Sequence, residues 1–228
     1  GVRRALGKAA KHMPYFKGHN FLMKGAEMAE EYFVGQALVW PEREVSSVLR
    51  PEYDKGEGAF ELAAPIYARV SDKSELIRKQ YLDMNMWLPG DILLKADKMC
   101  MAHSLELRVP FLDRRVMEFA EHIPDRYRVN ENGNKLVLRH AANKSLPDEW
   151  ATRPKVGFPV PMIYWLREEK WYNWVKEYFT APWASEVFDC DVLMRLLDEH
   201  YEGKAQNQRK IYTPLVFLVW YKRYFIDE

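Results

Sequence analysis

Three charged side chains, Lys95, Asp97 and Lys98, lie close together in the stretch that runs from Asp91 to Asp113. At about 100° per residue, Lys95, Lys98 and Asp91 fall on one side of a helix. The other side carries Ile92, Leu93, Ala96, Met99, Cys100 and His103. Lysines on the polar side are suited to binding phosphate, and a carboxylate beside them could orient a lysine or a metal ion. The same spacing fits a core-packed helix whose outer face holds an i,i+4 pair, Asp91 with Lys95, and it leaves both interpretations open.

The segment after this helix contains Glu106 and Arg108, which fall on one side of an extended chain by their spacing of two. If buried, the two side chains would form hydrogen-bonded ties that fix the turn that follows. We interpret them as structural support, because paired acidic and basic residues near a turn usually brace the backbone. Asp113 is expected to be the N-cap of the next helix.

A second stretch with chemical potential is the proline-rich segment from Leu146 to Pro161, which we expect to be an ordered, non-helical loop. Within it, Lys155 stands between Pro154 and Gly157. A lysine on a stiff backbone is a candidate for a fixed cation that stabilises developing negative charge, or for a proton carrier. A surface lysine in a proline-rich connection is the simpler alternative.

Composition and charge exclude several classes of protein. Lys and Arg total 34 against 33 for Asp and Glu, so no overall charge favours nucleic acid or an acidic membrane surface. The 228 residues contain two widely separated cysteines and no long apolar run, which predicts neither a disulfide framework nor a membrane span and favours the cytoplasm. The six histidines have no metal-ligand spacing, so no metal ligand is predicted, and His103 is expected to be a core residue.

The elements that must position these residues are predicted to be mostly helices, because apolar residues recur at spacings of three and four. Residues 1–228 are expected to form a single, mainly α domain with little or no sheet. Asp72 with Glu75 is expected to form a capping box, and Asp191 is expected to be an N-cap. Helices are predicted over Leu22–Gly35, Phe60–Val70, Glu75–Leu88, Pro89–Ser104, Asp113–His122, Asn134–Ser145, Pro161–Phe179, Asp191–Tyr201 and Arg209–Phe225.

Several motifs in order resemble the asparagine synthetase family. They are LLKADKMCMAHSLELRVPFLD, then KLVLRHAA at Lys135–Ala142, and then RPKVGF, with a looser match at EEYFVGQALVW. The resemblance implies the helical C-terminal part of an adenine-nucleotide-hydrolase-like α/β synthetase domain. The family's pyrophosphate loop of the type SGG-x-DS, its SGEGSDE-like motif and its N-terminal glutaminase do not occur in this sequence, so we expect these segments to lie upstream.

The resemblance further implies an enzyme that adenylates the side chain of aspartate with ATP and transfers ammonia from glutamine, giving asparagine, AMP and pyrophosphate. Lys155 resembles the family's catalytic lysine. Lys95, Asp97 and Lys98 match a helix that borders the site, while Glu106, Arg108 and Asp113 match its scaffold. ATP and Mg²⁺ are expected to be bound mainly by segments missing from this chain.

Two alternatives remain open at this stage. A related amidotransferase acting on another carboxylate would share these motifs. The chain by itself could also be a non-catalytic helical module that needs a partner segment, and as an isolated chain we expect it to be inactive. The expected partners are aspartate, ATP, ammonia from glutamine, and the upstream glutaminase and nucleotide-binding segments. Neither nucleic acid nor a membrane is expected, and a homodimer is left open.

Overall fold

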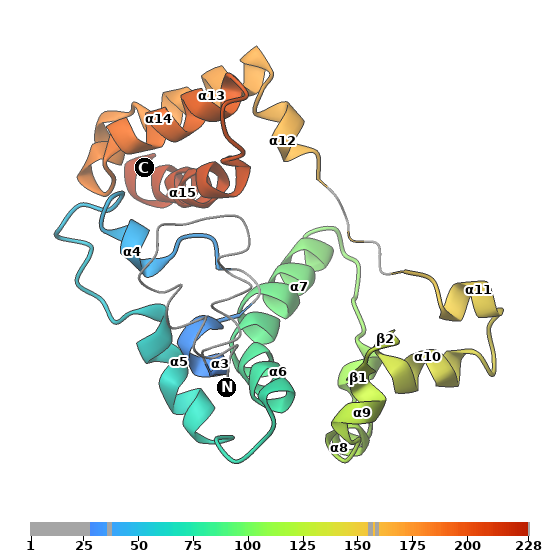
Figure 1. Ribbon diagram of the computed structural model, residues 1–228. Coiled ribbons are helices and arrows are strands. Elements are labelled where there is room, and N and C mark those ends of the chain that lie inside the picture. Colours follow the sequence, from blue (N-terminus) through green and yellow to red (C-terminus); the bar gives the residue numbers. More distant parts are fainter. Residues whose placement is uncertain (1–27, 36–37, 155–156, 158–159, 228) are drawn as a thin grey trace. The chain divides into compact units, whose positions relative to one another are not determined.

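The protein is mainly helical. The computed structural model describes residues 28–35, 38–154, 157 and 160–227. In these ranges the sheet is limited to one antiparallel ribbon, β1 (Val129–Asn130) paired with β2 (Gly133–Asn134) (Figure 1). The prediction of a mainly α chain with little sheet is confirmed.

The described residues form two compact units, which are treated separately below. The first unit holds 28–35, 63–154 and 157, and the second holds 38–62 and 160–227. That both are parts of a single domain of residues 1–228 stays a prediction.

The elements of the first unit are α3 (Ala29–Tyr32), the end of α5 (Ala59–Ala68), α6 (Glu75–Asn85), the π-helical turn η1 (Leu88–Leu93), α7 (Leu94–Met101), the 3₁₀ turn η2 (Pro110–Leu112), α8 (Arg114–Glu121), α9 (Asp125–Arg128), β1, β2, α10 (Leu136–Ala142) and α11 (Asp148–Ala151).

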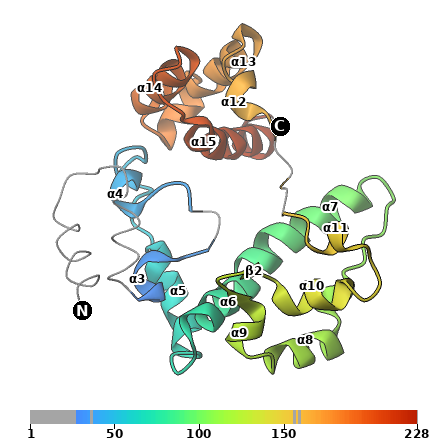
Figure 2. The same ribbon diagram turned by 45° about the vertical axis from the view of Figure 1, so that its right-hand side comes forward.

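The second unit is built around three longer helices. Its elements are α4 (Glu42–Val45), the start of α5, α12 (Met162–Trp165), α13 (Glu169–Phe179), the 3₁₀ turn η3 (Pro182–Glu186), α14 (Cys190–Tyr201), α15 (Gln208–Tyr221) and the π-helical turn η4 (Lys222–Ile226). Figure 2 shows α14 and α15 beside each other, in agreement with their contacts.

The core of the first unit joins α3, α5 and α6. Leu82 of α6 packs with Ala29, Ala63 and Tyr67, and all four are buried. The Tyr67 hydroxyl donates to the carbonyl of Phe33 over 2.7 Å. These contacts fix the short helix α3, which is too short to be stable by itself.

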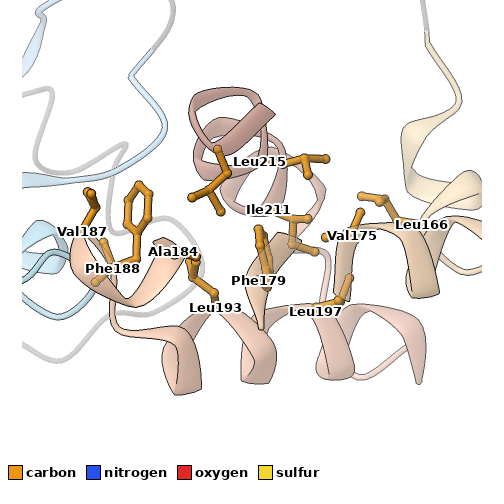
Figure 3. Packing of buried hydrophobic residues seen from close by; sticks show 12 residues of the cluster. Leu166, Val175, Phe179, Ala184, Val187, Phe188, Leu193, Leu197, Ile211 and Leu215 are labelled. Carbon is orange, nitrogen blue, oxygen red and sulfur yellow. The ribbon is translucent and has the colours of Figure 1, made fainter. Parts of the chain in front are cut away.

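The core of the second unit lies between α13, α14 and α15. Each helix turns one apolar stripe inward, and the side chains interdigitate there (Figure 3). Fully burying a Leu, Ile or Phe side chain contributes about 1.5–3 kcal/mol, so this cluster is the main source of stability in the unit. Its buried members are Val48, Leu166, Val175, Phe179, Ala184, Val187, Phe188, Leu193, Leu197, Ile211, Leu215 and Leu218.

His200 is the buried polar residue of this core, at 0% exposure. Its Nε2 lies 3.1 Å from the carbonyl oxygen of Ile163, and its Nδ1 lies 3.1 Å from the backbone N–H of Asn207. A carbonyl only accepts and an N–H only donates, so the ring must be neutral, with its proton on Nε2. One imidazole thereby links α12, α14 and the start of α15.

Most predicted helices are present, with shorter bounds. In the range predicted for the first, Leu22–Gly35, α3 covers Ala29–Tyr32, and residues 22–27 lie outside the described residues. The single helix predicted over Pro161–Phe179 is wrong, because it divides into α12 and α13 where Glu168 adopts extended backbone. The expected loop over Leu146–Pro161 contains α11. Pro147 precedes its first turn, where a proline removes no helical hydrogen bond.

Two predicted N-cap residues are wrong by two positions, because a neighbouring side chain takes the capping position. Ser74, not Asp72, caps α6 by accepting from the N–H of Ile77 over 3.3 Å. Asp189, not Asp191, caps α14 and accepts from two backbone N–H groups. The sequence pattern located the turn at which each helix begins, but it did not identify the side chain that caps the helix.

We predict that the second unit loses stability as the pH falls from 7 to 5. Burial lowers the pKa of His200 below its ordinary 6.5, and the Ile163 carbonyl opposes this only in part. Below pH 6.5 the unfolded chain takes up a proton that the folded chain does not, so stability is full above that pH and decreases below it, by at most about 1.4 kcal/mol per pH unit.

The measurement is denaturant unfolding followed by tryptophan fluorescence, for the wild type and for His200→Gln. The difference in the free energy of unfolding between the two should shrink toward pH 5. His140→Gln, at an exposed position of α10, is the control and should leave the pH dependence unchanged. If the difference in the free energy of unfolding between the wild type and His200→Gln stayed constant with pH, the assignment of His200 as a buried neutral imidazole would be contradicted.

Candidate functional site

The polar side of α7 carries the predicted phosphate-binding residues. Lys95 Nζ lies 3.3 Å from Asp91 Oδ1, and Trp87 Nε1 donates to Asp91 Oδ2 over 3.0 Å. The predicted i,i+4 pair is therefore present. Both of its side chains are about half exposed or more, so it contributes only a few tenths of a kcal/mol, roughly.

Asp97 and Lys98 are exposed on the same helix. Among the described residues neither side chain has an ion-pair or hydrogen-bond partner. Lys95, Asp97 and Lys98 thus share one short helix, but the described residues do not enclose them in a cleft.

Of the two interpretations left open for this helix, packing of its apolar side on a core is not seen among the described residues. No residue of α7 is buried, Met99 is 64% exposed, and His103 is exposed rather than a core histidine. Helical spacing identifies which side chains share a stripe, but it cannot identify what covers that stripe. Here the described residues supply no cover for it.

The end of α7 is a well-formed turn. Ser104 has φ 56°, in the left-handed region, and its N–H donates to the carbonyl of Met101 over 3.0 Å. The N–H of Leu105 donates to the carbonyl of Cys100 over 2.9 Å. This pair of bonds is the Schellman arrangement, which satisfies carbonyls that a helix end would otherwise leave free.

The extended segment that follows contains the Glu106–Arg108 pair. Arg108 Nη2 lies 2.5 Å from Glu106 Oε1, so the two side chains do meet. Their side chains are 69% and 83% exposed, however, so the burial that would let them brace the turn is not seen among the described residues. Spacing of two places residues on one side of a chain but does not bury them.

Asp113 is the N-cap of α8, as predicted. Its Oδ1 accepts from the N–H of Arg115 over 3.0 Å and from Arg115 Nε over 3.2 Å. An open hollow beside it is lined by Pro110, Asp113, Arg115, Val116 and Phe119.

Arg128 closes the other end of α8, a role that the sequence analysis missed. Its Nη2 donates to the carbonyls of Ala120 and Glu121 over 2.6 and 3.2 Å, and its Nε donates to Ile123 over 2.7 Å. Its Nη1 donates to Gln80 Oε1 of α6 over 3.0 Å. A cation at the carbonyl end of a helix also complements the helix dipole.

Arg139 joins three backbone carbonyls that lie far apart in sequence. Its Nε donates to Asn134 over 3.1 Å, and its Nη1 donates to both Ala151 and Arg153 over 3.0 Å each. We call this set, the Arg139 guanidinium with the carbonyl oxygens of Asn134, Ala151 and Arg153, the Arg139 bridge. The sequence analysis quoted Arg139 within a motif but assigned it no role.

Lys155, the predicted catalytic residue, lies outside the described residues. The bridge ends two residues before it, at Arg153. The structure therefore describes how the approach to Lys155 is held and does not describe Lys155 itself.

The second unit contains an apolar pocket of about 360 Å³. Beside it, Lys210 forms an ion pair with Glu44 and lies 5.2 Å from the ring centre of Trp40. The pocket offers almost no polar atoms, so it does not resemble a site for charged substrates. It is lined by Trp40, Val45, Val48, Leu49, Tyr53, Val187, Phe188, Thr213, Pro214 and Phe217.

The part of the chain that the structure describes contains no group of three or more His, Cys, Asp or Glu side chains that could hold a metal ion, so it does not fit a magnesium site of its own. No helix in these ranges has the length and apolar character needed to cross a bilayer. Cys100 and Cys190 are free thiols.

Comparison with known proteins places this mainly helical chain within a family of ligases. The asparagine synthase family matches residues 5–222. Asparagine synthetase [glutamine-hydrolyzing] 1 of Bacillus subtilis is 36% identical over 234 residues, covering 100% of this chain and 37% of that protein. A putative asparagine synthetase [glutamine-hydrolyzing] of Mycobacterium tuberculosis is 35% identical, covering 96% of this chain and 34% of that protein. The Homo sapiens asparagine synthetase [glutamine-hydrolyzing] is 34% identical over 70% of this chain.

The chain belongs to the asparagine synthase family. The predicted resemblance is confirmed. The chain spans little more than a third of the length of the Bacillus and Mycobacterium relatives, and no solved structure matches it.

We predict that Asp113 and the Glu106–Arg108 pair differ in their effect on stability. Asp113→Ala removes an N-cap and should lower the free energy of unfolding by about 1 kcal/mol. Glu106→Gln and Arg108→Gln break an exposed ion pair and should change it little, since exposed pairs contribute little. Thermal unfolding of the three variants is the measurement. A loss for Glu106→Gln equal to that for Asp113→Ala would show that the pair is covered in the folded protein.

Proposed function

We propose that this chain is the C-terminal part of the synthetase region of an ATP-dependent asparagine synthetase that uses glutamine. The observation that carries the proposal is the similarity to a named synthetase over the whole chain, from the first helices to the last. The cytoplasm is the compartment we propose for it.

The proposed reaction has two steps. A side-chain carboxylate oxygen of aspartate attacks the α-phosphorus of ATP, which forms β-aspartyl-AMP and releases pyrophosphate. Ammonia derived from glutamine then attacks the acyl carbon, which forms the amide of asparagine and releases AMP with the oxygen that had joined the two groups. Both steps develop negative charge on oxygen, so a fixed cation close to that charge would accelerate them.

We assign that cation to Lys155, as the proposed catalytic residue. The assignment is supported by its place in RPKVGF and by the Arg139 bridge, which holds the carbonyls of the residues just before it. Its ammonium would neutralise charge during adenylation and assist proton transfer when ammonia attacks.

The other predicted residues take supporting roles in this proposal. Lys95, Asp97 and Lys98 are proposed to contact substrate or phosphate, because their side chains are exposed, and the pairing of Lys95 with Asp91 is itself exposed and weak. Asp113 supports the site by capping α8, and Glu106 with Arg108 borders it.

ATP and Mg²⁺ are proposed to be held mainly by nucleotide-binding segments that this chain does not include. The partners are then the glutaminase and nucleotide-binding segments of the same enzyme, together with aspartate, ATP and ammonia.

We predict that Lys155→Ala, made in the full-length protein, lowers aspartate-dependent exchange of pyrophosphate into ATP by about 100-fold or more, as removal of one charge-stabilising donor does in other enzymes. Hydrolysis of glutamine should change little, because it takes place in another segment. Lys144→Ala, at an exposed position in the turn after α10, is the matched control and should leave both activities unchanged.

Unchanged exchange in Lys155→Ala would remove this residue from the site. Exchange that requires an acid other than aspartate would instead favour a related amidotransferase. No exchange with any acid would favour a non-catalytic helical module.

A further inference from the structure

The Arg139 bridge connects the motif KLVLRHAA to the segment that leads to Lys155. Arg139 belongs to α10 and is half-buried, while two of the carbonyls that it binds belong to residues 12 and 14 positions later. Both of these bonds come from the same nitrogen, Nη1, at 3.0 Å each. The third, from Nε to Asn134, fixes the guanidinium against the start of its own helix.

The two distant carbonyls are groups that need an external donor. Ala151 is the last residue of α11, and a helix leaves its final carbonyls without intrahelical partners. Arg153 precedes Pro154, which has no N–H and therefore cannot hold this part of the chain through a donor of its own. The carbonyl oxygen of Arg153 is thus the group through which a hydrogen bond can hold the Arg153–Pro154 peptide in place.

The bond to Arg153 therefore holds the chain two positions before Lys155 in the sequence. Pro154 stiffens the chain that follows, because its φ is locked near −65°.

We propose that Arg139 is a positioning residue for the synthetase reaction and acts by holding the segment that places Lys155. The inference rests on the proposed function of Lys155. Replacing Arg139 should then slow adenylation, although Arg139 itself touches neither the substrate nor the reacting atoms.

Arg128 provides the matched comparison. It makes a similar set of bonds to helix-end carbonyls in the same unit, but these close α8 and contact α6, and none of them leads to Lys155. If Arg139 were only a brace for the fold, its replacement would resemble replacement of Arg128.

The experiment is a double-mutant cycle in the full-length protein with Arg139→Ala, Lys155→Ala and the two together, measured by aspartate-dependent pyrophosphate exchange. Displacement of a catalytic group by about 1 Å costs about 100-fold in rate, so Arg139→Ala should lower kcat 10- to 100-fold, roughly, while glutamine hydrolysis is kept. The double variant should be no slower than Lys155→Ala alone, because residues that act through one group are not additive.

Two further variants keep the test sharp if Arg139→Ala folds poorly. Arg139→Lys retains the charge and one of the three carbonyl bonds, and it should restore part of the lost exchange activity. Arg128→Ala should lower the thermal unfolding temperature but leave kcat for exchange within about twofold of the wild type, since no bond of Arg128 leads to the reacting groups.

Each other outcome overturns the inference. Losses for Arg139→Ala and Lys155→Ala that multiply in the double variant would show that Arg139 acts independently, although the role of Lys155 would stand. Loss of glutamine hydrolysis in parallel, with Arg139→Lys no better than Arg139→Ala, would show a general folding role. Full exchange activity in Lys155→Ala would refute both the inference and the catalytic assignment on which it rests.

Discussion

This structure depends on one constraint. Backbone carbonyl oxygens that accept no hydrogen bond from a backbone N–H must find another donor. Its helices are short, and many of them end close to a turn or a proline, so their last carbonyls must be satisfied by side chains. In the first unit the donors are the guanidinium groups of Arg128 and Arg139, which each bind three backbone carbonyls. Arginine is suited to this task because its planar group presents several donors in fixed directions. The order of α8, α9 and α10 therefore rests largely on polar bonds, since none of their residues is buried.

The second unit meets the same constraint inside an apolar core. The imidazole of His200 accepts from the N–H of Asn207 and donates to Ile163, so α12 and the start of α15 are joined through α14. Around it, α13, α14 and α15 bury a continuous set of aliphatic and aromatic side chains. Beside this core, the rings of Trp165, Trp171, Trp174 and Tyr178 pack in a row, with successive ring centroids 5.2–6.2 Å apart.

The amino-acid sequence was sufficient for the features that depend on local pattern. Spacing of apolar residues predicted the helices, and local chemistry predicted the Asp113 cap and the Asp91–Lys95 pair. It was insufficient where a distant group decides the outcome. Asp189 instead of Asp191, the exposed His103 and the exposed Glu106–Arg108 pair all depend on which neighbours are present in space. The Arg139 bridge belongs to the same class, since nothing in KLVLRHAA indicates that its arginine binds carbonyls beyond the next helix. Lys155 was inferred from resemblance and lies outside the described residues, so its role stays a prediction.

Family membership, the Arg139 bridge and the charged face of α7 support our proposal that this chain forms part of a site for making an amide through an acyl-adenylate. The claim is tested most directly by following oxygen. The full-length protein would be given aspartate labelled with ¹⁸O in its side-chain carboxylate, with ATP, magnesium and glutamine, and the products analysed by mass spectrometry. Our account predicts asparagine together with AMP that carries one ¹⁸O atom in its phosphate. Label found in inorganic phosphate with ADP as the nucleotide product, or AMP without label, would contradict it.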